Sequence, residues 1–533
     1  MKSLLSVDQA RTNDNYTMNT VGIGETELIT RVAKSVLSVL QNGAYDLTHP
    51  CILCGSGNNG ADGLALALML KEQNYAVKVV YLGKLYADPT EQKPKKKNKK
   101  DAEPAIAPEM SGTPDVEAMS AQCRSLFTHV QNAGIEILTD ALPEDATLYV
   151  DAIFGIGFHG TLDARTASMI QAVNASSTPV VSVDIPSGVN ADNGQAAEAI
   201  YATETVTVQA LKIGLQVYPG TEHTGKITVA DVGIENDPAA ADPQCSVLEQ
   251  EDIAALMPPR PARSCKGTFG RVLVVCGSVG MAGAAYLAAS GAFRMGAGLV
   301  EIFTPMKNRV VLQQLIPEAI ITCYSSNSKK DMVKSLKYAI GRADAVVLGC
   351  GLGRSKQAKK IVATVLKKTR VPLVIDADAL NIIARKPALL KKIKKEQKMQ
   401  TVITPHAAEA ARLLGKSTKV DAVLECTYAS AEQLHQKFGI NVLLKDTHSV
   451  IYATDGAHYV NTSGSTALAT AGSGDILAGM IGGLAASQTN QNPISKTAAL
   501  AAYLHGKAGE KAAENVGEHA AMARDILEGL KKS

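Results

Sequence analysis

The chain has 533 residues, which at about 100 to 200 residues per domain is enough for two or three domains. Apolar residues make up 46% of the sequence and charged residues 20%, a composition that permits a packed core and excludes a wholly disordered chain. The formal net charge of +3, from 54 basic and 51 acidic residues, is too balanced to indicate a nucleic-acid partner.

The cellular setting follows from the absence of targeting segments and from the use of cysteine. No apolar stretch is long enough for a signal peptide or a membrane-spanning helix, so we expect a cytoplasmic protein with no membrane partner. Nine cysteines are too few in a chain of this length for a disulfide framework. Cys51 and Cys54 have the spacing of a redox pair, but they lie inside an apolar run, so we expect two buried structural thiols.

Short apolar runs recur along the chain, and most of them end at glycine, aspartate or another small polar residue. Strands without polar alternation are buried on both faces, which is typical of parallel sheets covered by helices. Helical patterns with one apolar stripe lie between the runs, as at residues 28–40. The sequence therefore predicts two doubly wound α/β domains. The predicted strands are 51–54, 77–82, 148–151, 180–184, 272–276, 345–348, 373–376, 402–404 and 442–445.

Two irregular segments interrupt this order. Residues 236–247 begin with a stretch rich in proline, alanine and aspartate, and we interpret them as a linker between domains at 1–235 and 248–533. The second segment, residues 84–121, carries a lysine cluster at 93–100. We interpret this cluster as part of a solvated insertion loop, with a nuclear signal or a polyanion-binding patch as the alternatives.

A glycine-rich turn, CGSGNNGADG at 54–63, follows the first predicted strand. Its glycines have the spacing of a dinucleotide-binding fingerprint, but the next strand ends at 81–83 without the acid that would bind the ribose. The turn instead carries Asn58, Asn59 and Asp62, which a plain pyrophosphate loop does not need. We therefore expect a turn that does more than bind phosphate.

Two later strand ends supply matching chemistry, VDAIFGIGFHGT at 150–161 and VDIPSG at 183–188. Ligands bind at the carboxyl ends of parallel strands, so Asp151, Asp184 and Ser187 are expected to meet the polar side chains of the first turn in one crevice. Oxygen donors of this kind suit a small cation or a hydroxylated substrate. The alternative is that each aspartate only stabilises a turn or a helix start.

The second half contains the phrase TAGSGDILAGM, in which glycines lead directly into a predicted helix. Free backbone N–H groups at residues 472–474 would form an anion site at the helix start, and Asp475 stands at its mouth. This carboxylate either stabilises the helix or takes a proton from an attacking hydroxyl beside bound phosphate. No Walker lysine motif occurs, so the pattern indicates phosphate chemistry without a P-loop. His406 is open between a structural and a ligand-binding role.

The three phrases of the first half resemble the N-terminal domain of NAD(P)H-hydrate epimerase, over residues 1–235. The loop of that family usually reads N-N-G-G-D-G, and this chain has Ala61 at the fourth position. The resemblance implies catalytic roles for Asp62 and Asp184, and a potassium ion held by Asn59, Asp151 and Ser187. It also implies contact with the hydrated nucleotides NADHX and NADPHX through Asn58, Asn59, Gly60, Ala61, Asp62, Gly155, Ile156, Gly157, Phe158, His159, Gly160, Thr161 and Asp184.

Five phrases of the second half resemble the ADP- or ATP-dependent NAD(P)H-hydrate dehydratase, which has a ribokinase-like fold, over residues 248–533. The phrases, in order, are KGTFGRVLVV, GCGLG, DADALN, TPHAAEAARLLG and GSGD. Asp446 stands where the family usually has glycine, which leaves the nucleotide preference open. The resemblance implies magnesium with ADP or ATP as co-substrate, and a catalytic Asp475. The implied nucleotide contacts are Lys445, Asp446, Thr447, His448, Ser449 and Gly474, and the implied hydrate contacts are Ala285, Gly351, His406 and Asp475.

The two resemblances together imply a Rossmann-like doubly wound domain followed by a ribokinase-like α/β domain, and a bifunctional metabolite-repair enzyme. As an isomerase it would interconvert R- and S-NAD(P)HX, and as a lyase it would dehydrate the S form to NAD(P)H, converting ADP or ATP to AMP or ADP and phosphate. Its partners would be these small molecules, with no nucleic acid, in a homo-oligomer. One alternative is a hydroxyethylthiazole-like kinase with an accessory nucleotide-binding domain, and another is a nucleotide sensor or scaffold. The kinase alternative leaves the first-half motifs without a purpose.

Overall fold

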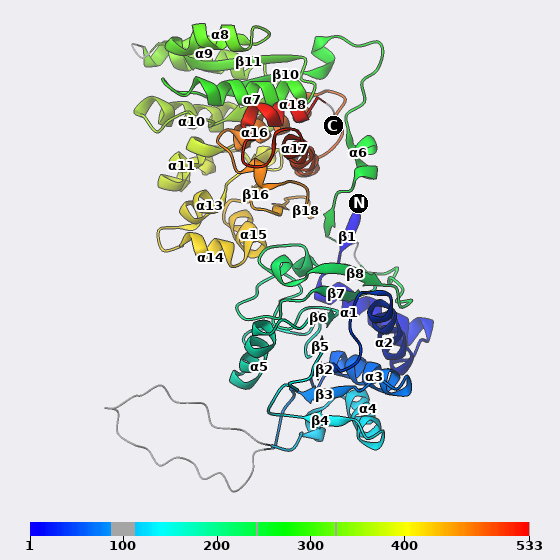
Figure 1. The fold of residues 1–533 in the computed structure, drawn as a ribbon. Coiled ribbons are helices and arrows are strands. Elements are labelled where there is room, and N and C mark those ends of the chain that lie inside the picture. Colours follow the sequence, from blue (N-terminus) through cyan, green and yellow to red (C-terminus); the bar gives the residue numbers. More distant parts are fainter. Residues whose placement is uncertain (87–111, 241–243, 326–327, 532–533) are drawn as a thin grey trace, which may run out of the picture. The chain divides into compact units, whose positions relative to one another are not determined.

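The computed structural model describes residues 1–86, 112–240, 244–325 and 328–531 (Figure 1). The chain divides into two compact units. The first unit begins at Leu5 and ends before Gln244, and the second joins Met1–Leu4 to the residues from Gln244 onward. The lysine cluster predicted to lie in an insertion loop, 93–100, is outside the described residues.

A seven-stranded sheet, parallel throughout, forms the centre of the first unit, in the order β4-β3-β2-β5-β6-β7-β8 (Figure 1). Its strands are β2 (Pro50–Cys54), β3 (Lys78–Tyr81), β4 (Glu136–Leu138), β5 (Leu148–Ala152), β6 (Val180–Val183), β7 (Glu204–Val208) and β8 (Lys226–Ala230). Its α-helices are α1 (Val7–Tyr16), α2 (Glu25–Asn42), α3 (Asn58–Glu72), α4 (Ala121–Asn132) and α5 (Ala164–Ala175).

Both faces of this sheet are covered, as strand β2 shows. Ile52 and Cys54 pack in one apolar cluster with residues of α2, α3 and α4, whereas Cys51 and Leu53 pack in another with residues of α5. All five residues of β2 are consequently buried, which explains why its sequence has no polar alternation. The predicted doubly wound α/β fold is confirmed for this unit.

The two cysteines of β2 are structural, as the sequence predicted. Cys51 and Cys54 belong to clusters on opposite faces of the sheet, and both are free, buried thiols. Burial raises the pKa of Cys51 to about 12 and raises the pKa of Cys54 well above its ordinary value, so neither is a reactive thiolate at neutral pH.

An eleven-stranded sheet forms the centre of the second unit, in the order β1-β9-β18-β17-β16-β15-β14-β13-β10-β11-β12. The strands from β12 to β16 in this order are parallel, whereas β17 is antiparallel to both β16 and β18. The strands are β1 (Lys2–Leu4), β9 (Cys245–Val247), β10 (Arg271–Val275), β11 (Leu299–Pro305), β12 (Ile320–Tyr324), β13 (Ala345–Leu348), β14 (Leu373–Ile375), β15 (Thr401–Ile403), β16 (Asn441–Leu444), β17 (Ser449–Tyr452) and β18 (His458–Asn461).

The helices of the second unit lie mainly between its parallel strands and after β18. They are α6 (Gln250–Leu256), α7 (Ala282–Arg294), α8 (Arg309–Leu315), α9 (Lys329–Ile340), α10 (Lys356–Lys368), α11 (Ala377–Arg385), α12 (Lys395–Lys398), α13 (Ala407–Leu414), α14 (Val420–Leu424), α15 (Thr427–Phe438), α16 (Ser473–Ala486), α17 (Ile494–Val516) and α18 (Ala523–Gly529). Helices α7, α16, α17 and α18 pack with strand β10 in one large apolar cluster. No helix of the described segments is long and apolar enough to cross a membrane.

The join between the units differs from the predicted linker at 236–247. Its last three residues, Cys245–Val247, form β9, which pairs with β18 and with the N-terminal strand β1. A strand of three residues is too short to show a period, and both of its partners are distant in sequence. The composition of this stretch therefore gave no sign that it completes the second sheet.

Candidate active sites

The first unit contains a cavity of about 570 Å³ at the carboxyl ends of its strands. Residues that follow β2, β5, β6 and β7 line it, together with residues of α1 and α2. The predicted site residues that line the cavity are Asn58, Asn59, Asp62, Gly155, Ile156, Gly157, Phe158 and Asp184. The other predicted substrate contacts, Gly60, Ala61, His159, Gly160 and Thr161, are not among the lining residues.

The glycine-rich turn is held tightly against the sheet, and its tip faces the cavity. A Cβ atom on Gly60 would lie 2.1 Å from the carbonyl oxygen of Gly55, so only glycine fits there. Ala61 is fully buried in the apolar core, which is compatible with its extra methyl group. Helix α3 begins after Gly57 with no side-chain cap, so its first N–H groups are available to an anion.

Asp184 lies at the floor of the cavity in an ion pair that the sequence analysis missed. Lys212 Nζ lies 2.5 Å from Asp184 Oδ1, and both side chains are largely buried. Asp184 has a backbone φ of +67°, a conformation that residues other than glycine seldom adopt. A Cβ on Gly155 would be 3.2 Å from Asp184 Oδ2 and 3.4 Å from Asn59 Cγ, so these two side chains meet at Gly155.

Three further carboxyl groups line the same cavity. Burial raises the pKa of Asp62 well above its usual range, and the charges of Asp184, Asp14 and Glu25 raise it further. Burial, followed by the charge of Asp184, raises the pKa of Asp14 to about 6. Two carboxyl groups with raised pKa values therefore lie near the lysine-paired Asp184, an arrangement typical of acid–base sites. The sequence analysis missed Asp14 and Glu25, because no local motif distinguishes them on the N-terminal helices.

Asp151, in β5, and Ser187, in the turn that follows β6, are joined by hydrogen bonds. Asp151 is fully buried, and it accepts hydrogen bonds from Ser187 Oγ at 2.5 Å, Ser187 N at 2.8 Å, Ser182 Oγ at 2.8 Å and Ile153 N at 3.3 Å. All of these donors are neutral, and no lysine or arginine in the described part of the chain pairs with this carboxylate. Burial raises the pKa of Asp151. A carboxylate without a basic partner, beside the hydroxyl groups of Ser182 and Ser187, fits a monovalent cation. The amide of Asn59, the third residue expected to hold potassium, donates to the carbonyl oxygen of Val183 at 3.2 Å.

The second candidate site lies at the start of α16. Gly472, which precedes this helix, has a φ of +96°, and a Cβ there would be 2.3 Å from a methyl carbon of Leu287. No side chain caps the helix, so the N–H groups of its first turn are available to an anion, as predicted from the glycines. Close packing on α7 fixes the helix, because a Cβ on Gly479 would be 1.9 Å from the carbonyl oxygen of Ala288.

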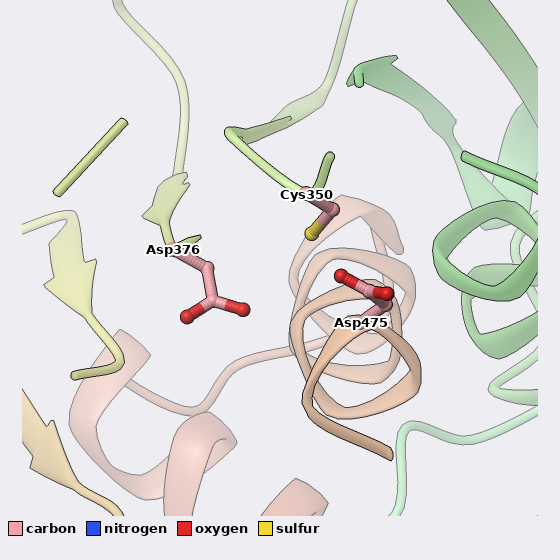
Figure 2. A group of neighbouring side chains, drawn as sticks. All are labelled: Cys350, Asp376 and Asp475. Carbon is pink, nitrogen blue, oxygen red and sulfur yellow. The ribbon is translucent and has the colours of Figure 1, made fainter. Parts of the chain in front are cut away.

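Asp475, in the first turn of α16, faces two side chains from neighbouring strand ends (Figure 2). One atom of each of Cys350, Asp376 and Asp475 lies within 4.8 Å of the others. Burial raises the pKa of Asp475 to about 7, and the charge of Asp376 adds to this, whereas a hydrogen bond from Cys350 opposes it. A carboxyl group with this pKa is suited to exchange protons near neutral pH.

Lys445 neutralises Asp376 in this cluster. Its Nζ lies 3.0 Å from Asp376 Oδ1, and a Cβ on Gly474 would be 3.2 Å from that nitrogen. A hydrogen bond with Cys276, together with burial, raises the pKa of the Cys350 thiol well above its ordinary value. With one carboxylate paired to lysine and the thiol protonated, the three groups are a poor cage for a metal ion.

Three other residues predicted in the second site, His406, Ala285 and Gly351, lie on elements that border this cluster. His406 caps α13, since its Nδ1 accepts a hydrogen bond from Ala408 N at 3.2 Å, and burial lowers the pKa of this histidine. Lys445 N donates to the carbonyl oxygen of Pro405 at 2.8 Å, which brings the turn 445–449 beside His406. Ala285 is fully buried in α7, and Gly351 lies against the start of that helix with a φ of +58°.

The unusual Asp446 has a local structural role. Its Oδ1 accepts a hydrogen bond from Thr447 N at 2.9 Å, and its backbone N–H donates to Ser449 Oγ at 3.4 Å. Ser449 Oγ in turn donates to the carbonyl oxygen of Asp446 at 3.2 Å. Asp446 therefore stabilises the turn between β16 and β17, where the expected glycine would supply only conformational freedom.

Two α/β units, each with a cluster of carboxyl groups at the carboxyl ends of its strands, have the organisation of a two-domain enzyme. Residues 272–532 match the family described as NAD(P)H-hydrate dehydratase, and residues 25–214 match the family described as YjeF-related protein N-terminus. A bifunctional NAD(P)H-hydrate repair enzyme Nnr from Moorella thermoacetica is 36% identical to this chain over 491 residues, which cover 90% of this chain and 86% of that protein.

Two solved structures are similar to the second unit. A ribokinase-like superfamily protein from Enterococcus faecalis is 26% identical with a TM-score of 0.47, covering 55% of this chain and 96% of its own. The ADP/ATP-dependent NAD(P)H-hydrate dehydratase from Bacillus subtilis, co-crystallised with ATP and Mg²⁺, is 26% identical with a TM-score of 0.44, covering 54% of this chain and 96% of its own. From the similarity of the Moorella protein over both units, this chain belongs to the family of bifunctional NAD(P)H-hydrate repair enzymes, as its motifs predicted.

Proposed function

We propose that the first unit interconverts R- and S-NAD(P)HX and that the second dehydrates the S form to NAD(P)H. One observation carries the proposal that both sites transfer protons. In each unit a carboxyl group with a raised pKa, Asp62 or Asp475, lies beside an aspartate that is paired with a lysine. Such a pair supplies a proton donor or acceptor next to a fixed negative charge, which is what proton transfer at a ring hydroxyl requires.

In the first unit, Asp62 and Asp184 would act on the hydroxyl group at C6 of the hydrated ring. Protonated Asp62 would donate its proton to this hydroxyl as the C6–O bond breaks, so that water leaves and the ring nitrogen shares its electron pair with C6. C6 is then planar, and water returns to either face while a carboxylate takes up its proton. The charge of Asp184, held by Lys212, stabilises the cationic ring between these steps.

Asn59, Asp151 and Ser187 would hold a potassium ion in this unit. The lack of a basic partner for buried Asp151 supports the assignment. Its four hydrogen-bond donors are all neutral, and no described basic group pairs with it. When bound, the ion would supply a positive charge that balances Asp151 and stabilises the turn that carries Asp184.

In the second unit, the Mg²⁺ complex of ADP or ATP is the proposed co-substrate. Its phosphates would bind the N–H groups at Gly474 and the turn 445–449, and the hydrate would contact Ala285, Gly351, His406 and Asp475. Asp475 would accept the proton of the C6 hydroxyl as its oxygen attacks the terminal phosphorus, which releases AMP or ADP. The C6–O bond of the phosphate ester then breaks, and loss of a proton from C5 forms the double bond of NAD(P)H.

The setting of the enzyme belongs to the same proposal. All nine cysteines are free thiols, which supports the expected cytoplasmic location, since disulfides are rare in that reducing compartment. A homo-oligomer is also expected, and light scattering on the purified protein measures it directly.

The test separates the two reactions with two isosteric substitutions, Asp184→Asn and Asp475→Asn. R- and S-NADHX are supplied separately with ADP or ATP, and epimer ratio, reduced-nicotinamide absorbance and phosphate are followed. We expect Asp184→Asn to dehydrate the S form but not to convert the R form. Asp475→Asn should interconvert the epimers without forming NADH. Release of a stable phosphorylated product would identify a kinase instead, and no turnover by the wild type would favour a sensor.

A further inference from the structure

Cys350 lies between two strand ends and the start of α16, directly beside Asp475 (Figure 2). Its side chain is fully buried, and its carbonyl oxygen accepts a hydrogen bond from Gly277 N at 2.8 Å. Cys276, which follows the neighbouring strand β10, lies beside its thiol and donates its own S–H to the carbonyl oxygen of Val347 at 4.0 Å. The backbone hydrogen bond and the neighbouring Cys276 therefore fix the position of Cys350 beside Asp475.

The thiol of Cys350 is a neutral donor. Its Sγ lies within 4.8 Å of a carboxylate oxygen of Asp475, whereas the nearby carboxylate of Asp376 is paired with Lys445. A protonated thiol next to a carboxylate can donate its single proton but cannot compete for the proton that a base removes from substrate, because its own pKa is far above neutral.

We propose that Cys350 is a positioning residue for the Asp475 base. Its thiol holds one carboxylate oxygen of Asp475 and leaves the other directed to the ring hydroxyl of the hydrate. This inference rests on the proposed function of Asp475, and it adds a residue that acts through Asp475 without touching substrate. The same bond stabilises the ionised form of the base and so sets the pH at which it becomes active.

Other groups also act on Asp475 and set the direction of each expected change. Asp376, and Asp378 in α11, raise the pKa of Asp475, whereas Lys445 at the end of β16 lowers it. Behind α16, His505 of α17 contacts Ser473 Oγ at 3.2 Å, and burial lowers the pKa of this histidine to about 4, so it is neutral at neutral pH. Loss of a hydrogen bond from Cys350 should therefore raise the pKa of Asp475 further.

The experiment measures single-turnover dehydration of S-NADHX at saturating ADP across neutral and alkaline pH. Cys350→Ala removes the donor, and Cys350→Ser keeps one. Cys276→Ala is the matched packing control, since it removes a buried thiol that contacts Cys350. Asp475→Asn tests the proposed function itself, and calorimetric titration with ADP reports whether the nucleotide site is intact in every variant.

We expect Cys350→Ala to shift the midpoint of the pH–rate profile upward by about 0.5 to 1 pH unit, the size of one weak hydrogen bond to a carboxylate. The rate near pH 7 should then fall about two- to fivefold and recover fully at alkaline pH, with ADP affinity unchanged. Cys350→Ser and Cys276→Ala should keep the wild-type midpoint. A purely structural defect would lower the rate at every pH.

Two outcomes overturn the proposal in different ways. If Asp475→Asn abolishes dehydration but Cys350→Ala has the wild-type midpoint, or Cys350→Ser shifts as far as alanine does, then Cys350 does not position the base. If Asp475→Asn keeps the wild-type rate, the proposed role of Asp475 itself is wrong, whatever the cysteine variants do.

Discussion

Lys212 and Asp184 form a buried ion pair in the first unit, with 2.5 Å between Nζ and Oδ1 and side-chain exposures of 3% and 11%. Lys212 Nζ also donates to Thr207 Oγ1 at 3.0 Å and to the carbonyl oxygen of Val208 at 2.7 Å. A lysine has three N–H donors, and here all three are used within the protein. Lys212 therefore holds Asp184 in place and is not available to bind substrate.

Lys212→Met should destabilise the first unit and abolish epimerisation. Removing the lysine leaves Asp184 buried without a counter-charge, a change that typically costs about 3–5 kcal/mol of unfolding free energy. Denaturant unfolding measures this loss, and dehydration of pure S-NADHX should persist in protein that is still folded.

Lys226→Met is the matched control for this substitution. Lys226 pairs with buried Glu204 at 3.0 Å, but its own side chain is 73% exposed, so its loss should cost no more than about 1 kcal/mol. The double substitution Asp184→Asn with Lys212→Met should regain stability without regaining epimerisation. Equal losses for the two single lysine variants would mean that the Lys212 pair is not effectively buried.

Asp14→Asn should stabilise the protein at neutral pH. The pKa of Asp14 is about 6 in the folded chain against 3.8 as the ordinary value, so the folded state favours the protonated form. Its contribution to stability is full below about pH 4 and is lost as pH rises through about 6. The amide never ionises, so we expect a gain of about 1–2 kcal/mol at pH 7, less than the full shift implies because the carboxyl is partly exposed.

Urea unfolding of wild type and Asp14→Asn at several pH values checks this prediction. The two curves should converge in acid and separate between about pH 4 and 6. Asp8→Asn, an exposed position on the same helix, is the control, and we expect it to change stability by less than about 0.5 kcal/mol. A difference between Asp14→Asn and wild type that is the same at every pH would contradict the assigned ionisation.

Potassium should stabilise the first unit through Asp151. We expect a higher melting temperature and faster epimerisation in potassium chloride than in choline chloride at equal ionic strength, because the ion balances a buried carboxylate. Asn59→Ala and Ser187→Ala should each reduce this difference. Crystals grown with and without potassium should differ in density at this place, and identical density or identical melting temperatures would contradict the assignment.

Much of the fold was predictable from the sequence because the strands are buried on both faces. The run at 51–54 has no polar alternation because β2 is covered by α2, α3 and α4 on one side and by α5 on the other. The short strands β1 and β9 were not predictable, since their pairing joins the first residues of the chain to residues near position 245. No local sequence pattern predicts a pairing between strands so far apart in the chain.

The candidate sites were predictable where a motif ends a strand, and not elsewhere. Asn59, Asp62 and Asp184 follow strands whose carboxyl ends meet, and all three line the cavity. Asp151 and Ser187, which were expected in the same crevice, are not among its lining residues. Lys212 follows β7 in the same way and could have been found by the same rule. Asp14 lies on helix α1, not at the end of a strand, and it lines the cavity only through tertiary packing. The proposed role of Cys350 likewise depends on its tertiary contact with Asp475.

Asp475→Asn should remove most dehydratase activity while nucleotide binding and epimerisation persist. The amide keeps the size of the side chain and still suits the first turn of a helix, but it cannot accept a proton as the ring hydroxyl attacks phosphorus. Losing a general base typically costs roughly 100 to 10,000-fold in rate. In the wild type the pKa of about 7 places the ionisation of Asp475 near neutrality, so its rate should rise with pH through about 7 and then level off.

Single-turnover rates and ADP titration of the same variant decide this prediction. Asp525→Asn is the control, because Asp525 also lies in the first turn of a helix, where it accepts a hydrogen bond from Met522 N at 2.8 Å, and asparagine can keep that bond. It should retain the wild-type rate and pH profile. The uncapped N–H groups at the start of α16 are unchanged in Asp475→Asn, so ADP should still bind. The loss of a general base should lower the rate far more than about threefold. If the rate of Asp475→Asn stays within about threefold of wild type, Asp475 only stabilises the helix start.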